Sequence, residues 1–268
     1  MKDLRNFKVI KNENNIYKVN HAIACDFDDM SNQGFYKLKL IPKNLPYQMV
    51  KNLLLNISPN YFFLNDKEDF FGNKEISFSI ENEHKFMGLN ISSEVILMKR
   101  EYEDALKSKI TIDEINKIMK NPKEIEDFWA STFLFETPNI KFSKQAASLG
   151  LESFDKDISI FQNVLNIAKN NDKGLNFFVS ALRILGIPCK ISKGYGINNE
   201  KIIAIASFYI PKASWVDIDV DKKEIINDNF ITLSWGYDAN DLDSFKADIS
   251  NINGKCKISQ EISIKKDL

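Results

Sequence analysis

The side chains that could support acyl-transfer chemistry are few in this sequence. Cysteine chemistry of that type needs a thiolate, a neighbouring base and a carboxylate that orients the base. The cysteines and histidines of the chain are Cys25, Cys189, Cys256, His21 and His84. Both histidines fall in the first third of the chain, within or near strand-like segments, so we expect them to have structural or surface roles. No local motif therefore brings a cysteine and a histidine together.

Other kinds of site leave no recognisable pattern. The sequence has no C-x-x-C pair, no G-x-S-x-G, no H-E-x-x-H, no glycine-rich phosphate loop and no metal-spaced Cys/His set, so we expect neither a metal nor a cofactor. Lys plus Arg is 36 against 37 for Asp plus Glu, a balance that argues against nucleic-acid binding. No uncharged apolar stretch of about 18 residues and no signal-peptide pattern is present. We expect a cytoplasmic protein without a membrane span.

One stretch, 174–197, predicts a short buried helix that leads into a strand. Its apolar residues recur at helical spacing and are Phe177, Phe178, Ala181, Leu182 and Leu185. Asn176 is a candidate N-cap. Gly186 can end the helix in a left-handed conformation, and Pro188 prevents its continuation. The next residue, Cys189, begins the predicted strand, where a small buried side chain is the simplest interpretation.

The surrounding chain divides into three expected regions. Residues 1–100 show period-two alternation and form a β-rich domain. Residues 101–135 form a helical connector, with a capping box of the T-x-x-E type at Thr111–Glu114. Residues 136–268 form the second domain, with strands at 202–210, 214–220 and 255–264.

Several of these segments resemble one family. LRILGIP followed by KGY, at 182–195, resembles a segment of transglutaminase-like proteins, which are relatives of papain-type cysteine peptidases. DFFGN at 69–73 resembles the β region that precedes many bacterial transglutaminase domains. SWGYDANDLDSF at 234–245 resembles the end of that module. The resemblance implies an α+β fold, with an N-terminal β domain before a papain-like core that has a central helix on an antiparallel sheet.

The same resemblance locates the positions of the family's catalytic triad. The Cys position falls on Asn176 by the local G-x-C match, or on Asn171 by counting back from the LR pair. The His position falls on Ile203 and the Asp position on Asp219. An amide and an isoleucine offer neither nucleophile nor base, so the resemblance implies a pseudoenzyme. Three further residues are candidates for lining the former groove: Trp215, Ser207 and Tyr195.

Two functional hypotheses follow from these positions. The first is a non-catalytic transglutaminase-like protein that binds a peptide or protein partner through the former active-site groove; family analogy implies an ATP-grasp-like protein as one partner. The alternative is an active amide hydrolase or acyl transferase that uses replaced groups, with Cys189 as a relocated nucleophile. A purely structural subunit is a third possibility. A closed contact between Asn176, Ile203 and Asp219 would favour a structural role, and an open groove there would favour binding.

Overall fold

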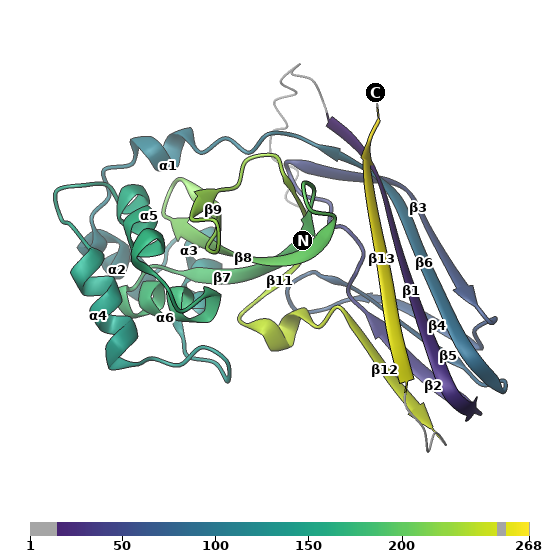
Figure 1. The fold of residues 1–268 in the computed structure, drawn as a ribbon. Coiled ribbons are helices and arrows are strands. Elements are labelled where there is room, and N and C mark those ends of the chain that lie inside the picture. Colours follow the sequence, from purple (N-terminus) through teal and green to yellow (C-terminus); the bar gives the residue numbers. More distant parts are fainter. Residues whose placement is uncertain (1–14, 251–255, 268) are drawn as a thin grey trace.

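The computed structural model describes residues 15–250 and 256–267, and within them it shows a mixed α+β fold built from three antiparallel sheets and a group of helices (Figure 1). The predicted α+β class is confirmed. Two four-stranded sheets form the β-rich side of the molecule. The first has the order β13-β1-β6-β3, and its strands are Cys256–Lys266, Asn15–Ser31, His84–Leu97 and Gln48–Ser58. The second has the order β12-β2-β5-β4, and its strands are Phe245–Ser250, Gln33–Leu38, Lys74–Ile80 and Phe63–Glu68.

The alternation predicted for the N-terminal region positions β1 in a shared core. Tyr17 and Val19 of this strand are buried, whereas Lys18 and Asn20, which alternate with them, are exposed. Side chains from both four-stranded sheets contribute to this core. The DFFGN segment forms a turn with Gly72 at φ +67°. Asn73 has no positive φ; its side chain bonds instead to the backbone of Trp235, 162 residues away.

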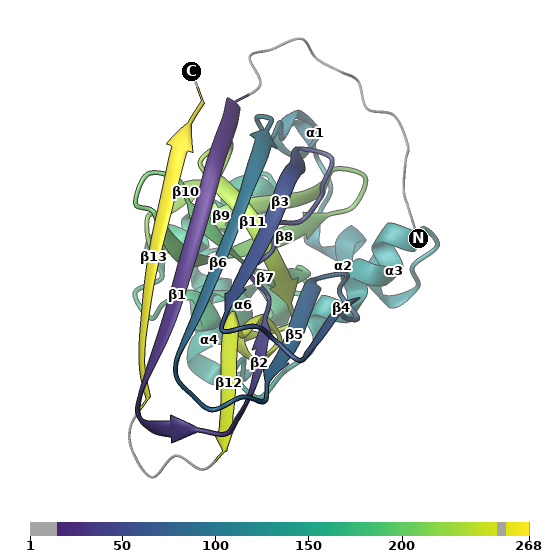
Figure 2. The same cartoon turned by 90° about the vertical axis from the view of Figure 1, so that its right-hand side faces the viewer.

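The last two strands lie in a different place from the one we predicted. The sequence places 255–264 in the second domain, but β13 pairs with β1 in a continuous antiparallel register from Tyr17↔Lys266 to Phe27↔Cys256. In the same way β12 pairs with β2. Figure 2 shows β13 and β1 side by side in front of the five-stranded sheet. Sequence alternation identified these segments as strands, but it carries no information on which distant strand they join.

The third sheet has five strands and lies between the helices and the β-rich side (Figure 1). Its order is β10-β9-β8-β7-β11, and the strands are Glu224–Ile225, Ser214–Asp219, Lys201–Ile210, Cys189–Gly196 and Phe230–Gly236. The helices are α1 to α6, at Glu103–Lys107, Ile112–Lys120, Ile125–Ser131, Lys144–Ser153, Ile160–Asn170 and Leu175–Leu185. Two 3-10 turns, η1 at Thr132–Leu134 and η2 at Ala239–Leu242, complete the described elements.

Local signals set several helix ends. The capping box of α2 forms as predicted, because the Thr111 side chain accepts from Glu114 N while the Glu114 carboxylate accepts from Thr111 N. Gly186 ends α6 in the left-handed conformation at φ +84°. The predicted N-cap is wrong by two residues, since Gly174 occupies that position and Asn176 lies exposed in the first turn.

The central helix α6 packs as expected. Phe178 and Leu182 are fully buried in one core with Phe208 of β8 and Val216 of β9. The predicted contact of this helix with strands 202–210 and 214–220 is therefore confirmed. Side chains of α2 and α3 belong to the same core, so the segment 101–135 packs with the helices that follow it.

Candidate functional site

Three polar side chains lie in one row on the face of the five-stranded sheet that α6 does not cover. Lys190 of β7 is paired with Ser207 of β8, and Ser207 is paired with Asp217 of β9. Their strand neighbours Cys189 and Phe208 belong to the core shared with the helices. Because side chains along a strand alternate between the two faces of a sheet, the row points to the opposite side.

Asp217 is the centre of a buried polar group. Ser207 Oγ donates to Asp217 Oδ1 at 2.5 Å and lies 2.9 Å from Ser192 Oγ. The Nε atom of Arg100, in the segment after β6, lies 3.2 Å from Asp217 Oδ2. Burial is the largest single effect on the pKa of Arg100 and lowers it, but Asp217, Tyr47 and Tyr102 together outweigh burial and hold that pKa above its usual value. The ion pair fixes the segment around Arg100 onto the sheet.

Lys190 has a different environment. Its Nζ lies 4.2 Å from the centroid of the Trp215 ring and 4.0 Å from that of Trp235. Only 8% of the residue is exposed. Burial lowers the pKa of Lys190 to about 8, although attraction from Asp217 opposes the change. Two indole faces stabilise a cation, but an indole side chain has no acceptor atom for the three N–H groups of the ammonium.

A cavity of about 780 Å³ opens beside this row. It lies between the five-stranded sheet and two segments of the chain, 45–47 and 98–102, and Lys190, Trp215, Asp217 and Trp235 are among its lining residues. Its size is typical of pockets that take a small molecule or part of a peptide. Aromatic walls with a few polar groups are the usual composition of such sites.

The predicted groove residues are only partly associated with this cavity. Trp215 lines it. Ser207 lies directly behind the lining and is fully buried, so its hydroxyl is out of reach of a ligand. Tyr195 lies elsewhere, in the core of the β-rich side, where its hydroxyl donates to Leu40 O at 3.4 Å and lies 3.0 Å from His21 Nδ1.

The positions assigned to the triad do not form an open groove. Ile203 and Asp219 line one hollow of about 10 Å³, the size of a single water. Asp219 accepts from Lys222 N at 3.0 Å and so stabilises the turn after β9. Neither Asn176 nor Asn171 lines this hollow. Asn171 follows α5, and its side chain donates to the carbonyl of the α6 N-cap at 3.0 Å.

The thiols and imidazoles of the described residues form no catalytic pair. Cys189 is fully buried, and this burial raises its pKa to about 12. Cys25 is also buried, with its pKa raised to about 12, chiefly by desolvation. His21 is bonded within the β-rich core, and His84 lies 2.7 Å from the carbonyl of Asn82. A neutral thiol without a neighbouring base is a poor nucleophile.

Sequence reasoning missed Lys190, Arg100 and Trp235 as site residues. One signal was present, because a lysine in a strand that is otherwise buried indicates a special role for its charge. Arg100 is paired with a residue 117 positions later in the chain, and no local pattern indicates such a contact.

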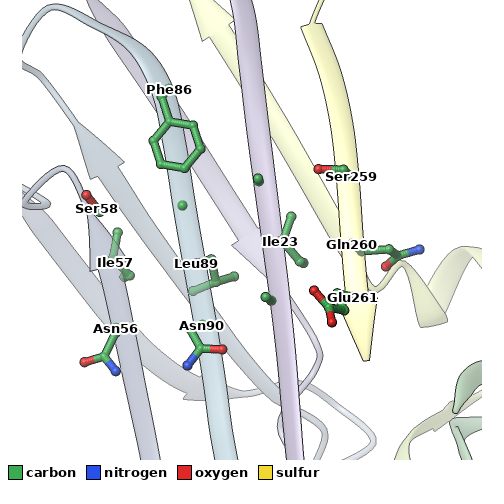
Figure 3. Close-up of a pocket in the computed structure, with 13 residues that line it drawn as sticks. Ile23, Asn56, Ile57, Ser58, Phe86, Leu89, Asn90, Ser259, Gln260 and Glu261 are labelled. Carbon is green, nitrogen blue, oxygen red and sulfur yellow. The ribbon is translucent and has the colours of Figure 1, made fainter. Parts of the chain in front are cut away.

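A second hollow, of about 530 Å³, lies on the first four-stranded sheet, where small side chains of β1 and β6 leave space beside Phe86 (Figure 3). Glu261 is the one ionisable side chain among its lining residues. This composition offers less chemistry than the cavity beside Lys190. Within the described ranges no group of three His, Cys, Asp or Glu side chains could hold a metal ion, and no helix there has the length and apolarity to span a membrane.

Comparison with known structures defines the class of fold. The chain is similar to a crystal structure described as "a Putative Cysteine Protease from Cytophaga hutchinsonii", with a TM-score of 0.69 and 13% sequence identity. The similarity covers 95% of this chain and 91% of the other. At this identity the match establishes the fold alone. Residues 17–96 match the family model of the bacterial transglutaminase-like N-terminal region, so the resemblance predicted for this part of the chain is confirmed. No curated protein matches the sequence.

Proposed function

We propose that this protein is a non-catalytic, transglutaminase-like binding protein that takes a peptide segment of a partner in the cavity beside Lys190. The observation that carries the proposal is the combination of an aromatic, charged cavity with the absence of a reactive pair among the described residues. Binding groups line the cavity, whereas the nearest thiol, that of Cys189, is sealed in the core on the other face of the sheet. A partner of the ATP-grasp type is the one that family analogy suggests.

The location of the proposed site differs from our first expectation. The hollow between Ile203 and Asp219 has no room for a peptide, so the proposal does not use the former triad positions. It uses the neighbouring cavity, to which Trp215 belongs. Tryptophan contributes a large contact area at interfaces, and an extended peptide could lie along the aromatic walls.

The competing hypothesis is an amide hydrolase or acyl transferase with replaced groups. It requires Cys189 or Ser207 to reach a substrate, and both residues are 0% exposed. Ser207 also lacks a histidine partner, because its hydroxyl bonds to Asp217 and Ser192. These contacts support a structural role for Ser207.

Two measurements test the proposed function. Purified protein is incubated with glutamine-containing peptides and an amine donor, beside a Cys189→Ala variant. We expect no turnover from either protein; turnover that disappears in the variant would establish enzyme activity and contradict the proposal. Binding is then measured with a peptide array on the wild type, Trp215→Ala and Trp129→Ala. Trp129 is 47% exposed and does not line the cavity, so peptide binding should be lost only in Trp215→Ala.

A further inference from the structure

Lys190 is unusual among the buried cations of the described residues. Four cationic side chains are buried there: Lys43, Arg100, Arg183 and Lys190. The first three have polar partners. Lys43 Nζ donates to Gly72 O at 2.6 Å, Arg100 pairs with Asp217, and Arg183 donates to backbone carbonyls. Within 15–250 and 256–267 the ammonium of Lys190 makes no hydrogen bond and no ion pair, although only 8% of the residue is exposed.

An unpartnered buried ammonium is costly to the folded protein. Burying a charge requires compensation by hydrogen bonds or an opposite charge. The indole rings of Trp215 and Trp235 supply part of this compensation and hold the ammonium at the wall of the cavity. The nearby carboxylate of Asp217 is already engaged by Arg100 and Ser207. Acceptors for this ammonium can therefore come from solvent or from a solute that enters the cavity.

The charges around the cavity indicate which acceptor fits. Three basic and three acidic side chains line it: Lys99, Arg100, Lys190, Glu101, Asp217 and Asp228. A wall of balanced charge does not attract a polyanion such as a nucleotide phosphate. Lys190 is the one buried cation of this wall without a polar partner in the described part of the chain, and a single such cation favours one negative charge. The aromatic rings on both sides of that cation favour an apolar group beside the charge.

We propose that the cavity binds a monocarboxylate that carries an aromatic or aliphatic group, with its carboxylate on Lys190 Nζ and its apolar group against Trp215. This inference rests on the proposed function and names the chemical group that the cavity recognises. The carboxylate belongs to a peptide, as a C-terminus or an acidic side chain, or to a free carboxylic acid. All of these offer the acceptor that the ammonium lacks.

The first experiment separates the carboxylate from the peptide. Phenylacetate and its neutral analogue phenylacetamide are titrated into the wild-type protein, with isothermal titration calorimetry and the ¹³Cε NMR signal of Lys190 as readouts. We expect phenylacetate to bind about tenfold or more tightly than the amide, since a charged hydrogen bond is stronger than a neutral one. It should also shift the Lys190 signal. Equal binding of both compounds, or no binding of either, overturns the inference.

Variants test whether Lys190 is the group responsible. Lys190→Met should lose the preference for phenylacetate over phenylacetamide, whereas Lys190→Arg should keep most of it. Lys201→Met is the matched control, because Lys201 is an exposed lysine of the adjacent strand, and it should bind as the wild type does. A full preference in Lys190→Met would refute the role of this residue.

Peptides identify the source of the carboxylate and separate this inference from the proposed function. N-acetyl-Gly-Phe is compared as the free acid and as the C-terminal amide. If the acid is favoured, a peptide C-terminus is a source. If peptides bind through Trp215 with no preference for the acid, the proposed function stands and the carboxylate inference is wrong. If phenylacetate binds at Lys190 and no peptide binds, the inference stands and peptide binding is wrong.

Discussion

Replacing Lys190 by methionine should stabilise the protein at neutral pH. The pKa of Lys190 is lowered from 10.5 to about 8. Each pKa unit corresponds to about 1.4 kcal/mol, so the charged form costs the folded state roughly 3 kcal/mol as an upper value. Methionine has a similar length and no charge, and it can pack between the same two rings. After allowance for relaxation around the charge, we expect a gain of about 1–3 kcal/mol in the free energy of unfolding at pH 7.

The pH dependence of this gain gives the sharper test. Between about pH 8 and pH 10.5 the unfolded chain keeps a proton on Lys190 that the folded protein has released. Since the unfolded state binds more protons in this window, this lysine makes the wild type more stable as the pH rises through it. Below pH 8 both states are protonated and the cost is constant. The gain in the free energy of unfolding from Lys190→Met should therefore be largest below pH 8. By pH 10.5 it should fall to the contribution that comes from the difference in packing between lysine and methionine.

Urea unfolding of the wild type, Lys190→Met and Lys201→Met at several pH values from 7 to 10.5 measures this difference. Comparing each variant with the wild type at the same pH removes the contribution of other titrating groups. For Lys201→Met, at an exposed position, the difference from the wild type in the free energy of unfolding should be small and independent of pH. If the difference for Lys190→Met is also independent of pH, the charged form of this lysine is not disfavoured in the folded protein. The argument for an unpartnered buried charge would then be wrong.

Three further predictions concern the thiols, the core and the buried ion pair. In the folded protein iodoacetamide should modify the exposed Cys256 and leave Cys189 unmodified, because the latter is buried and protonated; mass spectrometry that finds equal labelling would contradict this. Leu182→Ala should lower the free energy of unfolding by about 3 kcal/mol, as measured by urea denaturation, and an unchanged midpoint would mean that α6 packs through another face. Asp217→Asn should cost about 3–5 kcal/mol, since it leaves the Arg100 guanidinium buried without its counter-charge. Changing Arg100 to methionine in the same protein should restore part of that loss, and a further loss would refute the pairing.

Local chemistry made part of this fold predictable. The apolar spacing of 177–185, the left-handed Gly186 and the Thr111 capping box depend on neighbours within a few residues, and each formed as the sequence indicates. The predicted N-cap of α6, Asn176, is wrong, because Gly174 takes that position. Glycine took the position with a positive φ of 81°, which few other residues adopt.

The candidate site could not be predicted in the same way, because it is assembled by pairing between distant strands. Lys190 and Asp217 come onto one face through β8, and Arg100 arrives from the segment after β6. Family resemblance led instead to Ile203 and Asp219, which lie together at a closed hollow. Alternation identifies the face of a strand, but the pairing of strands decides which charges meet there.

The pairing of β13 with β1 and of β12 with β2 has a consequence for how the chain is made. The strands β1 and β2 leave the ribosome early, but their final partners are synthesised more than 200 residues later. The helices and the five-stranded sheet have contacts closer in sequence and can form while the two β-rich sheets are still incomplete. Until Phe245 and the residues after it emerge, β1 and β2 present unpaired edges, which are the part of a sheet most prone to join another chain. Nascent chains of this protein therefore have a long period in which a chaperone on the β-rich side would prevent aggregation.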